Sequence, residues 1–284
     1  MATQDDRKET PGAALYSPAV ALEFFKSVGK AESVAQGHTI FAEHEKAKAL
    51  LFQRSKMYLL LEGEVHLVAG KKVIGTVGKG QIFGEMGSIT QAPRSASAVA
   101  KTACRVIALD DKQFQQGLKN QPAFALMLMS MMIGRLRDTI ERLESNETLT
   151  PASAIKESVV FDPKRLAELV AGMVDDPPVY FDRDKVIVRE GQTGLRMYVV
   201  VEGRVAISVM GRVVERLPAG GVFGELALVE QSPRLASVFA ETDCQVLPVN
   251  RVAFLQLVKT SPEFASSLLG ALAERLRILT AKLK

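Results

Sequence analysis

The sequence contains only two cysteines and three histidines among 284 residues, which limits the kinds of site that it can form. Cys104 and Cys244 stand 140 positions apart in similar apolar runs, CRVIAL and CQVLPV. Equivalent positions in two separate domains do not face each other, so we expect two buried thiols instead of a disulfide or a metal pair. His38, His44 and His66 all lie in the first half and form no His-x-His pair, which argues against a metal site.

The sequence also lacks a long apolar run and a strong net charge. Its longest apolar stretch, residues 123–133, is interrupted by Ser130 and is too short to cross a bilayer. Charged residues at positions 5–9 replace the basic-then-apolar pattern of a signal peptide. The net charge of +4 does not by itself indicate nucleic acid as a partner. We therefore expect a cytoplasmic protein with neither a membrane nor a nucleic acid as its partner.

Two short stretches of the chain repeat each other. Residues 83–97 read FGEMGSITQAPRSAS and residues 223–237 read FGELALVEQSPRLAS. The glycines and the arginines of the two copies are each 140 positions apart. The repeat predicts two domains of similar fold, and 284 residues are enough for two hydrophobic cores.

The order of residue types in each copy favours a sugar phosphate as ligand. A glycine lets the backbone approach an anion, and the N–H groups of a following helical turn point at negative charge. The arginine after a proline offers a planar fork that matches two phosphate oxygens. A glutamate repels phosphate but can accept a hydrogen bond from a sugar hydroxyl. A Glu–Arg pair across a surface turn is the alternative for one copy, but two copies at one spacing favour binding.

Both copies resemble the phosphate-binding cassette of the cyclic nucleotide-binding domain family. The upstream pairs Met57-Tyr58 and Met197-Tyr198, followed by Glu62-Gly63 and Glu202-Gly203, are similar to that family's strand–glycine–strand pattern. The resemblance implies two tandem β jelly-roll domains, each ending in a long helix. The expected ranges are a tail at 1–16, a first domain at 17–145, a connector at 146–162 and a second domain at 163–284.

The resemblance also implies the site residues. Glu85 and Glu225 would hold a ribose 2′-hydroxyl, and Arg94 and Arg234 would clamp the cyclic phosphate. Ser97 and Ser237 match a small hydroxyl residue that approaches the base. Backbone N–H groups would complete the two cradles at Gly84, Met86, Gly87 and Ser95, and at Gly224, Leu226, Ala227 and Leu235. Leu235, which has no hydroxyl, favours cyclic AMP (cAMP) at the second site, whereas Ser95 does not distinguish cAMP from cyclic GMP (cGMP).

By this resemblance, the protein is expected to be a cyclic nucleotide receptor that signals to a protein partner. No Ser-His-Asp, Cys-His or paired-carboxylate arrangement repeats in both halves, so we expect no catalytic residues, and no cofactor beyond the nucleotide. Two cysteines are too few for the iron–sulfur cluster of some relatives. We expect no kinase, channel or helix-turn-helix segment after the second helix. Receptors for cGMP or cyclic di-GMP, and a ligand-free tandem scaffold, stay open as alternatives.

Hydrophobic patterns predict the elements around the cassettes. A short helix is expected at 17–28, and a helix at 163–173 opens the second domain. Short strands are expected at 38–41, 57–61, 65–68 and 73–77, and at 186–188, 197–201, 205–209 and 213–217. About six extra residues are expected in the first domain, at 46–52. The terminal helices show heptad seams, which favour a homodimer or an interdomain helix pair over the alternative of helices that lie only on their own barrels. The seams are Leu126, Met129, Ile133, Leu136, Ile140 and Leu143, and Leu269, Leu272, Leu276, Leu279 and Leu283.

Overall fold

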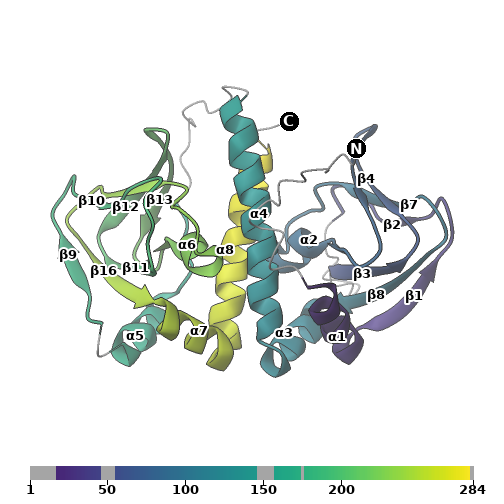
Figure 1. The fold of residues 1–284 in the computed structure, drawn as a ribbon, viewed down its shortest axis with the longest axis horizontal. Helices are drawn as coiled ribbons and strands as arrows, with labels where there is room; N and C mark the ends of the chain where they lie inside the picture. The colour runs from purple at the N-terminus through teal and green to yellow at the C-terminus, as the bar shows by residue number, and fades with distance from the viewer. Residues whose placement is uncertain (1–16, 46–54, 146–156, 174–175, 282–284) are drawn as a thin grey trace, which may run out of the picture. The chain divides into compact units, whose positions relative to one another are not determined.

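The computed structural model describes residues 17–45, 55–145, 157–173 and 176–281 of the chain. In the first barrel these residues form two four-stranded antiparallel sheets, in the orders β1-β8-β3-β6 and β2-β7-β4-β5 (Figure 1). The strands are β1 (Lys30–Val34), β2 (Thr39–Phe41), β3 (Lys56–Glu62), β4 (Val65–Ala69), β5 (Lys72–Val77), β6 (Ile82–Phe83), β7 (Ser97–Ala100) and β8 (Cys104–Asp110).

The second barrel repeats this topology. Its sheets have the orders β9-β16-β11-β14 and β10-β15-β12-β13. The strands are β9 (Val179–Phe181), β10 (Val186–Val188), β11 (Arg196–Glu202), β12 (Arg204–Val209), β13 (Arg212–Pro218), β14 (Val222–Phe223), β15 (Ser237–Ala240) and β16 (Cys244–Asn250). Seven of the eight predicted strands lie within these elements, and the eighth, 38–41, begins one residue before β2. The prediction of two jelly-roll sandwiches is confirmed.

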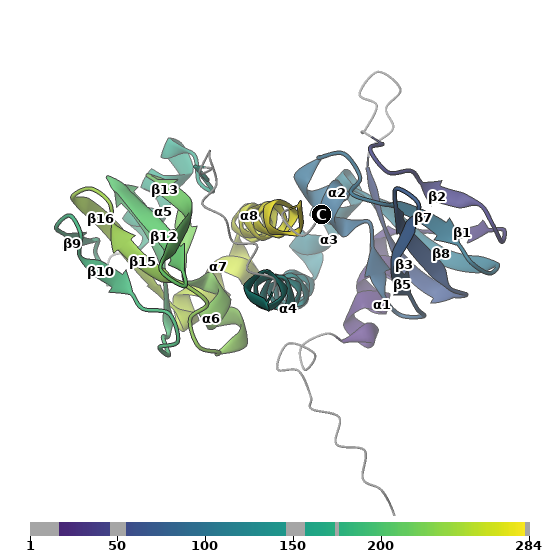
Figure 2. The same cartoon turned by 90° about the horizontal axis from the view of Figure 1, so that it is seen from above.

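Each barrel closes around a core between its two sheets, whose strands are seen from above in Figure 2. Valine, alanine, leucine and aromatic side chains from the strands fill the space between the two facing surfaces. Both cysteines belong to these cores as buried free thiols, as predicted. Gly63 and Gly203 join two strands with φ of 93° and 77°, and an added Cβ would collide with the carbonyl oxygen of Ala103 or Asp243. These two positions therefore need glycine.

Eight helices accompany the barrels in the described part of the chain. They are α1 (Pro18–Val28), α2 (Glu85–Thr90), α3 (Asp111–Asn120), α4 (Ala123–Ser145), α5 (Pro163–Gly172), α6 (Glu225–Glu230), α7 (Arg251–Thr260) and α8 (Pro262–Ala281). Side-chain caps start several of them, as at Ser17, Asp110 and Asp162. The helices predicted at 17–28 and 163–173 are confirmed. None of the described helices is both long and apolar enough to cross a bilayer.

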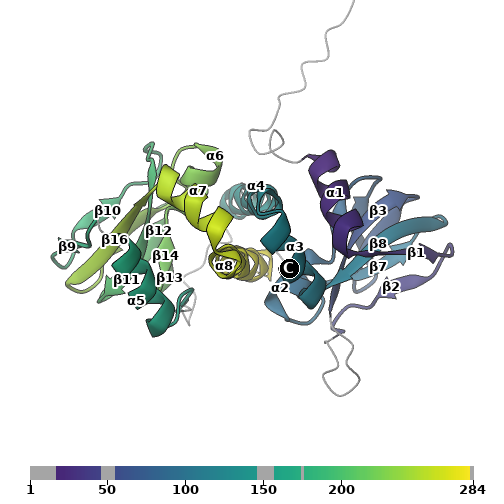
Figure 3. The ribbon, with the colours of Figure 1, turned by 90° about the horizontal axis from the view of Figure 1, so that it is seen from below.

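Four phenylalanines fasten the helices of the first barrel. The rings of Phe24 and Phe124 stack with centroids 3.7 Å apart, while Phe25 and Phe114 contact them edge-on. Gly117 leaves room for this cluster, because a Cβ there would come within 2.5 Å of the Phe24 ring. Figure 3 shows the result from below, with α1 lying against the sheet of β3 and β8.

Contacts divide the chain into two units. Each unit combines one barrel with part of the long helix that follows the other barrel in the sequence. Ser17–Leu128 clusters with Val258–Ile278, and Met129–Leu257 clusters with residues from Leu279 on. The predicted domain ranges instead run along the chain to the end of each long helix. The expected tail 1–16 and most of the expected connector, residues 146–156, lie outside the described residues.

The side chains of the heptad seams lie on the covered faces of the long helices. Met129, Ile133, Leu136 and Leu143 of α4 are buried, and Leu126 and Ile140 are half-buried. In α8, Leu269, Leu272 and Leu276 are buried, while Leu279 is half-buried; Leu283 lies outside the described residues. What covers these seams beyond their own unit stays a prediction.

Candidate functional site

Each repeated stretch folds into a strand, a glycine turn and one short helix. Gly84 and Gly224 adopt left-handed φ angles of 74° and 80° and cap α2 and α6. A Cβ at Gly84 would lie 3.1 Å from Nη1 of Arg94, and one at Gly224 would lie 2.6 Å from Nη1 of Arg234. Glycine is therefore required twice over, by the backbone conformation and by the close approach of the guanidinium group.

The two arginines are anchored in the same way. Arg94 donates to the carbonyl oxygens of Gly84 at 2.5 Å and Lys56 at 2.6 Å. Arg234 donates to the carbonyl oxygens of Gly224 at 2.6 Å and Arg196 at 2.5 Å. A guanidinium group carries five N–H donors, so these carbonyls account for two of them. The anchor fixes the plane of each fork before a ligand arrives.

Both arginines are held in dry surroundings. Arg94 is 7% exposed and Arg234 is 8% exposed. Burial lowers the pKa of both guanidinium groups, and the nearby carboxylates Glu85 and Glu225 oppose that effect. Arginine stays charged at neutral pH despite such a shift. Each cassette therefore presents a desolvated cation, which attracts an anion more strongly than an exposed one does.

The two glutamates are the first residues of α2 and α6. Glu85 and Glu225 are each 2% exposed. A helix N-terminus favours a carboxylate, so their position reduces the electrostatic cost of burying it. Both carboxylates lie near enough to the cassette arginines to influence the arginine pKa. The predicted combination of glycine, glutamate and arginine is thus brought together in each barrel.

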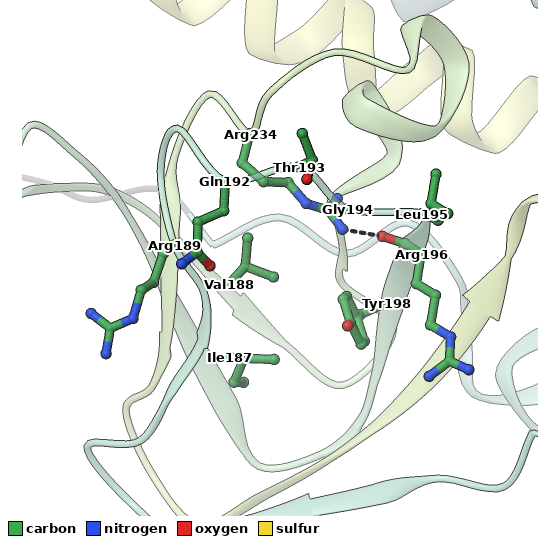
Figure 4. Close-up of a pocket in the computed structure, with 10 residues that line it drawn as sticks. All are labelled: Ile187, Val188, Arg189, Gln192, Thr193, Gly194, Leu195, Arg196, Tyr198 and Arg234. Atoms are coloured by element: carbon green, nitrogen blue, oxygen red, sulfur yellow. Dashed lines mark hydrogen bonds between the residues drawn. The ribbon is translucent and has the colours of Figure 1, made fainter.

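A cavity opens beside the second arginine. Its volume is about 550 Å³, within the range of roughly 300–1,000 Å³ that is typical of small-molecule sites. Figure 4 shows Arg234 on its wall with Gly194, and Tyr198 and Val188 among the apolar residues. The lining consists of Ile187, Val188, Arg189, Gln192, Thr193, Gly194, Leu195, Arg196, Tyr198 and Arg234. None of these ten residues, all within the described chain, is acidic.

Comparison with known proteins identifies the barrels. The sequence profile of the cyclic nucleotide-binding domain matches residues 31–121 and 178–261. The chain belongs to this family. Both predicted cassettes, residues 83–97 and 223–237, lie within the matched ranges.

The names of relatives in the family mention either cAMP or cGMP. The cAMP-dependent protein kinase regulatory subunit of Eremothecium gossypii is 28% identical over 71% of this chain and 39% of its own length. The cGMP-dependent protein kinase 2 of Mus musculus is 26% identical over 76% of this chain and 26% of its own length. This chain thus spans well under half of either relative.

One solved structure has a similar extent. The regulatory domain of Toxoplasma gondii PKA with cAMP is 22% identical and covers 96% of this chain and 98% of its own. The TM-score is 0.33, so this likeness adds nothing to the family assignment.

In this cyclic nucleotide-binding fold, the predicted serines also have structural roles. Ser97 Oγ accepts the backbone N–H of Glu43 at 2.8 Å, and Ser237 Oγ accepts that of Glu190 at 3.0 Å. The hydroxyl protons remain available as donors. The predicted contact of Ser97 and Ser237 with a base stays a prediction.

The other predicted residues lie around the cassette helices. Gly87 and Ala227 are buried, and a Cβ at Gly87 would lie 3.0 Å from Arg94. Met86, Leu226 and Leu235 are half-buried, whereas Ser95 is exposed. Of the residues predicted for the second site, Arg234 lines the cavity described above. The contacts of the remaining ones with a ligand stay predictions.

The sequence analysis missed the opposite wall of the second cavity. That wall comes from β10, from the loop 189–195 and from the start of β11. Gly194 is the most closely fitted residue, because a Cβ there would lie 2.6 Å from Nε of Arg234 and still closer to Nη2. An alignment of the two halves would have revealed the signal, since the loop is shorter in the second half.

The first domain is longer at this wall than predicted. Phe41 and Val188 occupy equivalent places in the two barrels. Phe41 is the last residue of β2 and pairs with Ala98 of β7, and Val188 is the last residue of β10 and pairs with Val238 of β15. They are 147 positions apart, whereas Met57 and Met197 are 140 apart. The first domain therefore has seven additional residues, and the predicted six resulted from matching Phe41 to Ile187. The predicted location, 46–52, lies outside the described residues.

An ion pair joins α4 to the second cassette. Nη2 of Arg137 donates to Glu230 Oε2 at 3.0 Å and to Ser232 Oγ at 2.8 Å. Glu230 ends α6, and its side chain is 2% exposed. Ile140 and Leu143 of α4 pack beside it against Val209. The helix that leaves the first barrel thus touches the end of the second cassette helix.

Proposed function

We propose that this chain is a cAMP receptor that binds one nucleotide in each domain and signals to a protein partner. Arg234 carries the proposal: it is buried, anchored by two carbonyls and placed on the wall of a cavity without acidic lining. A cyclic phosphate against Arg234 would leave the apolar wall of Val188 and Tyr198 for the sugar and base. Glu225 would accept the ribose 2′-hydroxyl.

Leu235 favours cAMP over cGMP at the second site. Its side chain offers no hydroxyl to a guanine, and it is half-buried next to Arg234. A hydroxyl at this position could supply one hydrogen bond to a guanine, and with Leu235 a guanine would lose that contribution to binding. The names of the relatives mention both nucleotides, so the choice rests on this residue.

Signalling is proposed to run from the cassette helix into α4. A nucleotide on Arg234 orders the backbone N–H groups at the start of α6, while Glu230 at the other end holds Arg137. If the ligand binds one position of α6 more tightly than another, α4 shifts with it, and the equilibrium moves accordingly. The proposed recipient is another protein in the cytoplasm, and the long helices are the proposed surface for a second copy or an interdomain pair.

Titration calorimetry with cAMP, cGMP and cyclic di-GMP tests the proposal. We expect cAMP to bind. We expect Arg234→Ala to weaken binding at the second site at least about a hundredfold, since a charge-assisted bidentate contact is lost. Arg183→Ala is the matched control, because Arg183 is an exposed arginine of the same barrel outside the cavity lining.

The titration also separates the alternatives. Tighter binding of cGMP or cyclic di-GMP would replace cAMP as the ligand. No heat and no rise in melting temperature with any of the three nucleotides would leave the ligand-free scaffold, and the receptor proposal would be wrong.

A further inference from the structure

The walls that face Arg94 and Arg234 carry different residues, although the anchors are the same. Three positions among the described residues differ in size or charge. Val188, Arg189 and Gln192 line the second cavity. The strand registers and the backbone hydrogen bonds of each arginine place Phe41, Ala42 and Glu45 at the same points in the first barrel.

The aromatic side chain of Phe41 occupies one face of the first guanidinium group. Its ring centroid lies 4.2 Å from Cζ of Arg94, and it stacks on Tyr58 with centroids 5.8 Å apart. Tyr58 is buried, and burial raises its pKa to about 12. In the second barrel Tyr198 is half-buried and lines the cavity beside the smaller Val188. The ring of Phe41 therefore fills space beside Arg94 and makes a cation–π contact with it. In the second barrel the smaller Val188 leaves the corresponding space to a ligand.

The charges around the two arginines differ as well. Glu45 is close enough to Arg94 to raise the pKa of the Arg94 guanidinium group. The Oε2 atom of Glu45 accepts a hydrogen bond from the backbone N–H of Ala42 at 2.8 Å. Gln192 at the equivalent point is neutral, and Arg189 adds a positive charge where Ala42 has none. At these two described positions the second wall is therefore two charges more positive than the first. An anion gains from each of these differences, although salt reduces the gain because Glu45, Arg189 and Gln192 are exposed.

We infer that the second domain holds the tight nucleotide site and the first domain a weaker one, because Phe41 and Glu45 replace Val188 and Gln192. This inference rests on the proposed function. It assigns Arg189 and Gln192 to the second site as residues that set its affinity and its salt dependence. It also makes the two sites fill in a fixed order as nucleotide concentration rises.

Calorimetry on single-site variants tests the inference with cAMP as the probe. We expect Arg94→Ala to keep the tight binding event and Arg234→Ala to abolish it, leaving binding at least about tenfold weaker, as a two-charge difference predicts. Circular dichroism and melting curves check that both variants are folded.

Exchange of the wall residues then tests the cause. In the Arg234→Ala background, Glu45→Gln should strengthen the remaining site by about three- to tenfold, the range for one partly screened charge. In the Arg94→Ala background, Gln192→Glu should weaken binding by a similar factor. Both positions are exposed, so neither change threatens folding. Phe41→Val in the first background should strengthen binding further.

Salt dependence gives a second readout. Arg189→Ala should flatten the decrease of affinity with salt at the second site, whereas Arg183→Ala should not, because Arg183 lies outside the cavity lining.

The outcomes separate the inference from the proposed function. If no nucleotide binds to the wild-type chain, the receptor proposal is wrong and this inference falls with it. If nucleotide binds but Arg234→Ala retains the tighter event, or if the wall exchanges leave both affinities unchanged, the inference is wrong and the receptor proposal stands.

Discussion

The two cassettes share a backbone conformation and an arginine anchor, but they differ in a few of their own residues and in the walls that face the arginines. The bonds from Arg94 and Arg234 reach the carbonyls of equivalent residues, at 2.5–2.6 Å in both barrels. The opposite wall carries Phe41 and Glu45 in one barrel and Val188 and Gln192 in the other. We therefore expect the repeated motif to place a phosphate, and residues outside the motif to influence how tightly each site binds it.

The comparison extends to a surface ion pair whose charges are exchanged. In the first barrel Glu64 Oε1 pairs with Lys101 Nζ at 2.6 Å. At the same positions in the second barrel Arg204 Nε pairs with Glu241 Oε2 at 2.6 Å. The geometry of the turn is kept while the signs are reversed. The two barrels thus keep an ion pair at this turn and differ only in which of the two positions carries the positive charge.

The largest effect is expected at Gly194. Gly194→Ala places a Cβ against the Arg234 guanidinium group, so either the arginine moves or the cavity wall does. We expect about a hundredfold loss of affinity at the second site, since a small displacement of a bidentate donor is costly. The control is Gly172→Ala, where no described atom lies within 4 Å of the added Cβ. Calorimetry on both variants decides, and equal affinities would show that the close fit is irrelevant.

The next effect is expected at the ion pair between α4 and α6. Glu230→Ala removes the carboxylate partner of the partly buried Arg137, which keeps its hydrogen bond to Ser232. We expect about 2 kcal/mol lower free energy of unfolding, below the usual 3–5 for a fully buried pair because Arg137 is partly exposed. Thr90 occupies the same place in the first cassette and bonds within its own helix, to the Met86 carbonyl.

Thr90→Ala is the matched change, and urea unfolding of both variants makes the comparison. We expect Thr90→Ala to cost about 0.5–1 kcal/mol, the net value of a local hydrogen bond. Equal losses in the two cassettes would mean that the contact with α4 contributes no stability.

A smaller, pH-dependent effect is expected at Glu241. Burial raises the pKa of this carboxyl, but hydrogen bonds and charges from Arg216 and Arg204 outweigh burial and lower it below 4.5. Its stabilisation is therefore present above pH 4.5 and is lost as pH falls through the lower folded pKa. Glu241→Gln should remove this part of the acid dependence, at most about 1 kcal/mol for a pair near the surface. Unfolding free energies from pH 6 to 3 provide the measurement; an unchanged slope would contradict it.

The smallest effect is expected in the long helices. Gly270 lies within α8, and no described atom is within 4 Å of a Cβ added there, apart from its own helix backbone. Gly270→Ala should raise the free energy of unfolding by about 0.5–1 kcal/mol through helix propensity. At the equivalent position of α4, Ser130 has a buried hydroxyl without a hydrogen-bond partner among the described residues. Ser130→Ala should therefore stabilise as well, and thermal unfolding compares the two.

Much of the fold was predictable because local rules and the repeat agree. Alternating apolar residues predicted the strands, and Ser17 and Asp162 begin helices as capping residues do. The glycine, glutamate and arginine of each cassette were also recognisable, since a short motif in one segment of chain carries them. The helices α3 and α7 were not predicted, because each directly follows the last strand of its barrel and its pattern merges with that of the next helix.

The amino-acid sequence alone determined that there are two barrels, two cassettes and two buried arginines. The residues of each cassette are close in sequence, and they obey local backbone rules. Tertiary structure decided which residues face those arginines. Val188, Gly194 and Tyr198 reach Arg234 from segments about 36–46 positions away. The pairing of β10 with β15, and a loop shorter by seven residues than its counterpart, bring them there. The register of strand pairing decides which side chains face each other in a sandwich. That register cannot be read from any local pattern in the sequence, because the paired strands are far apart along the chain.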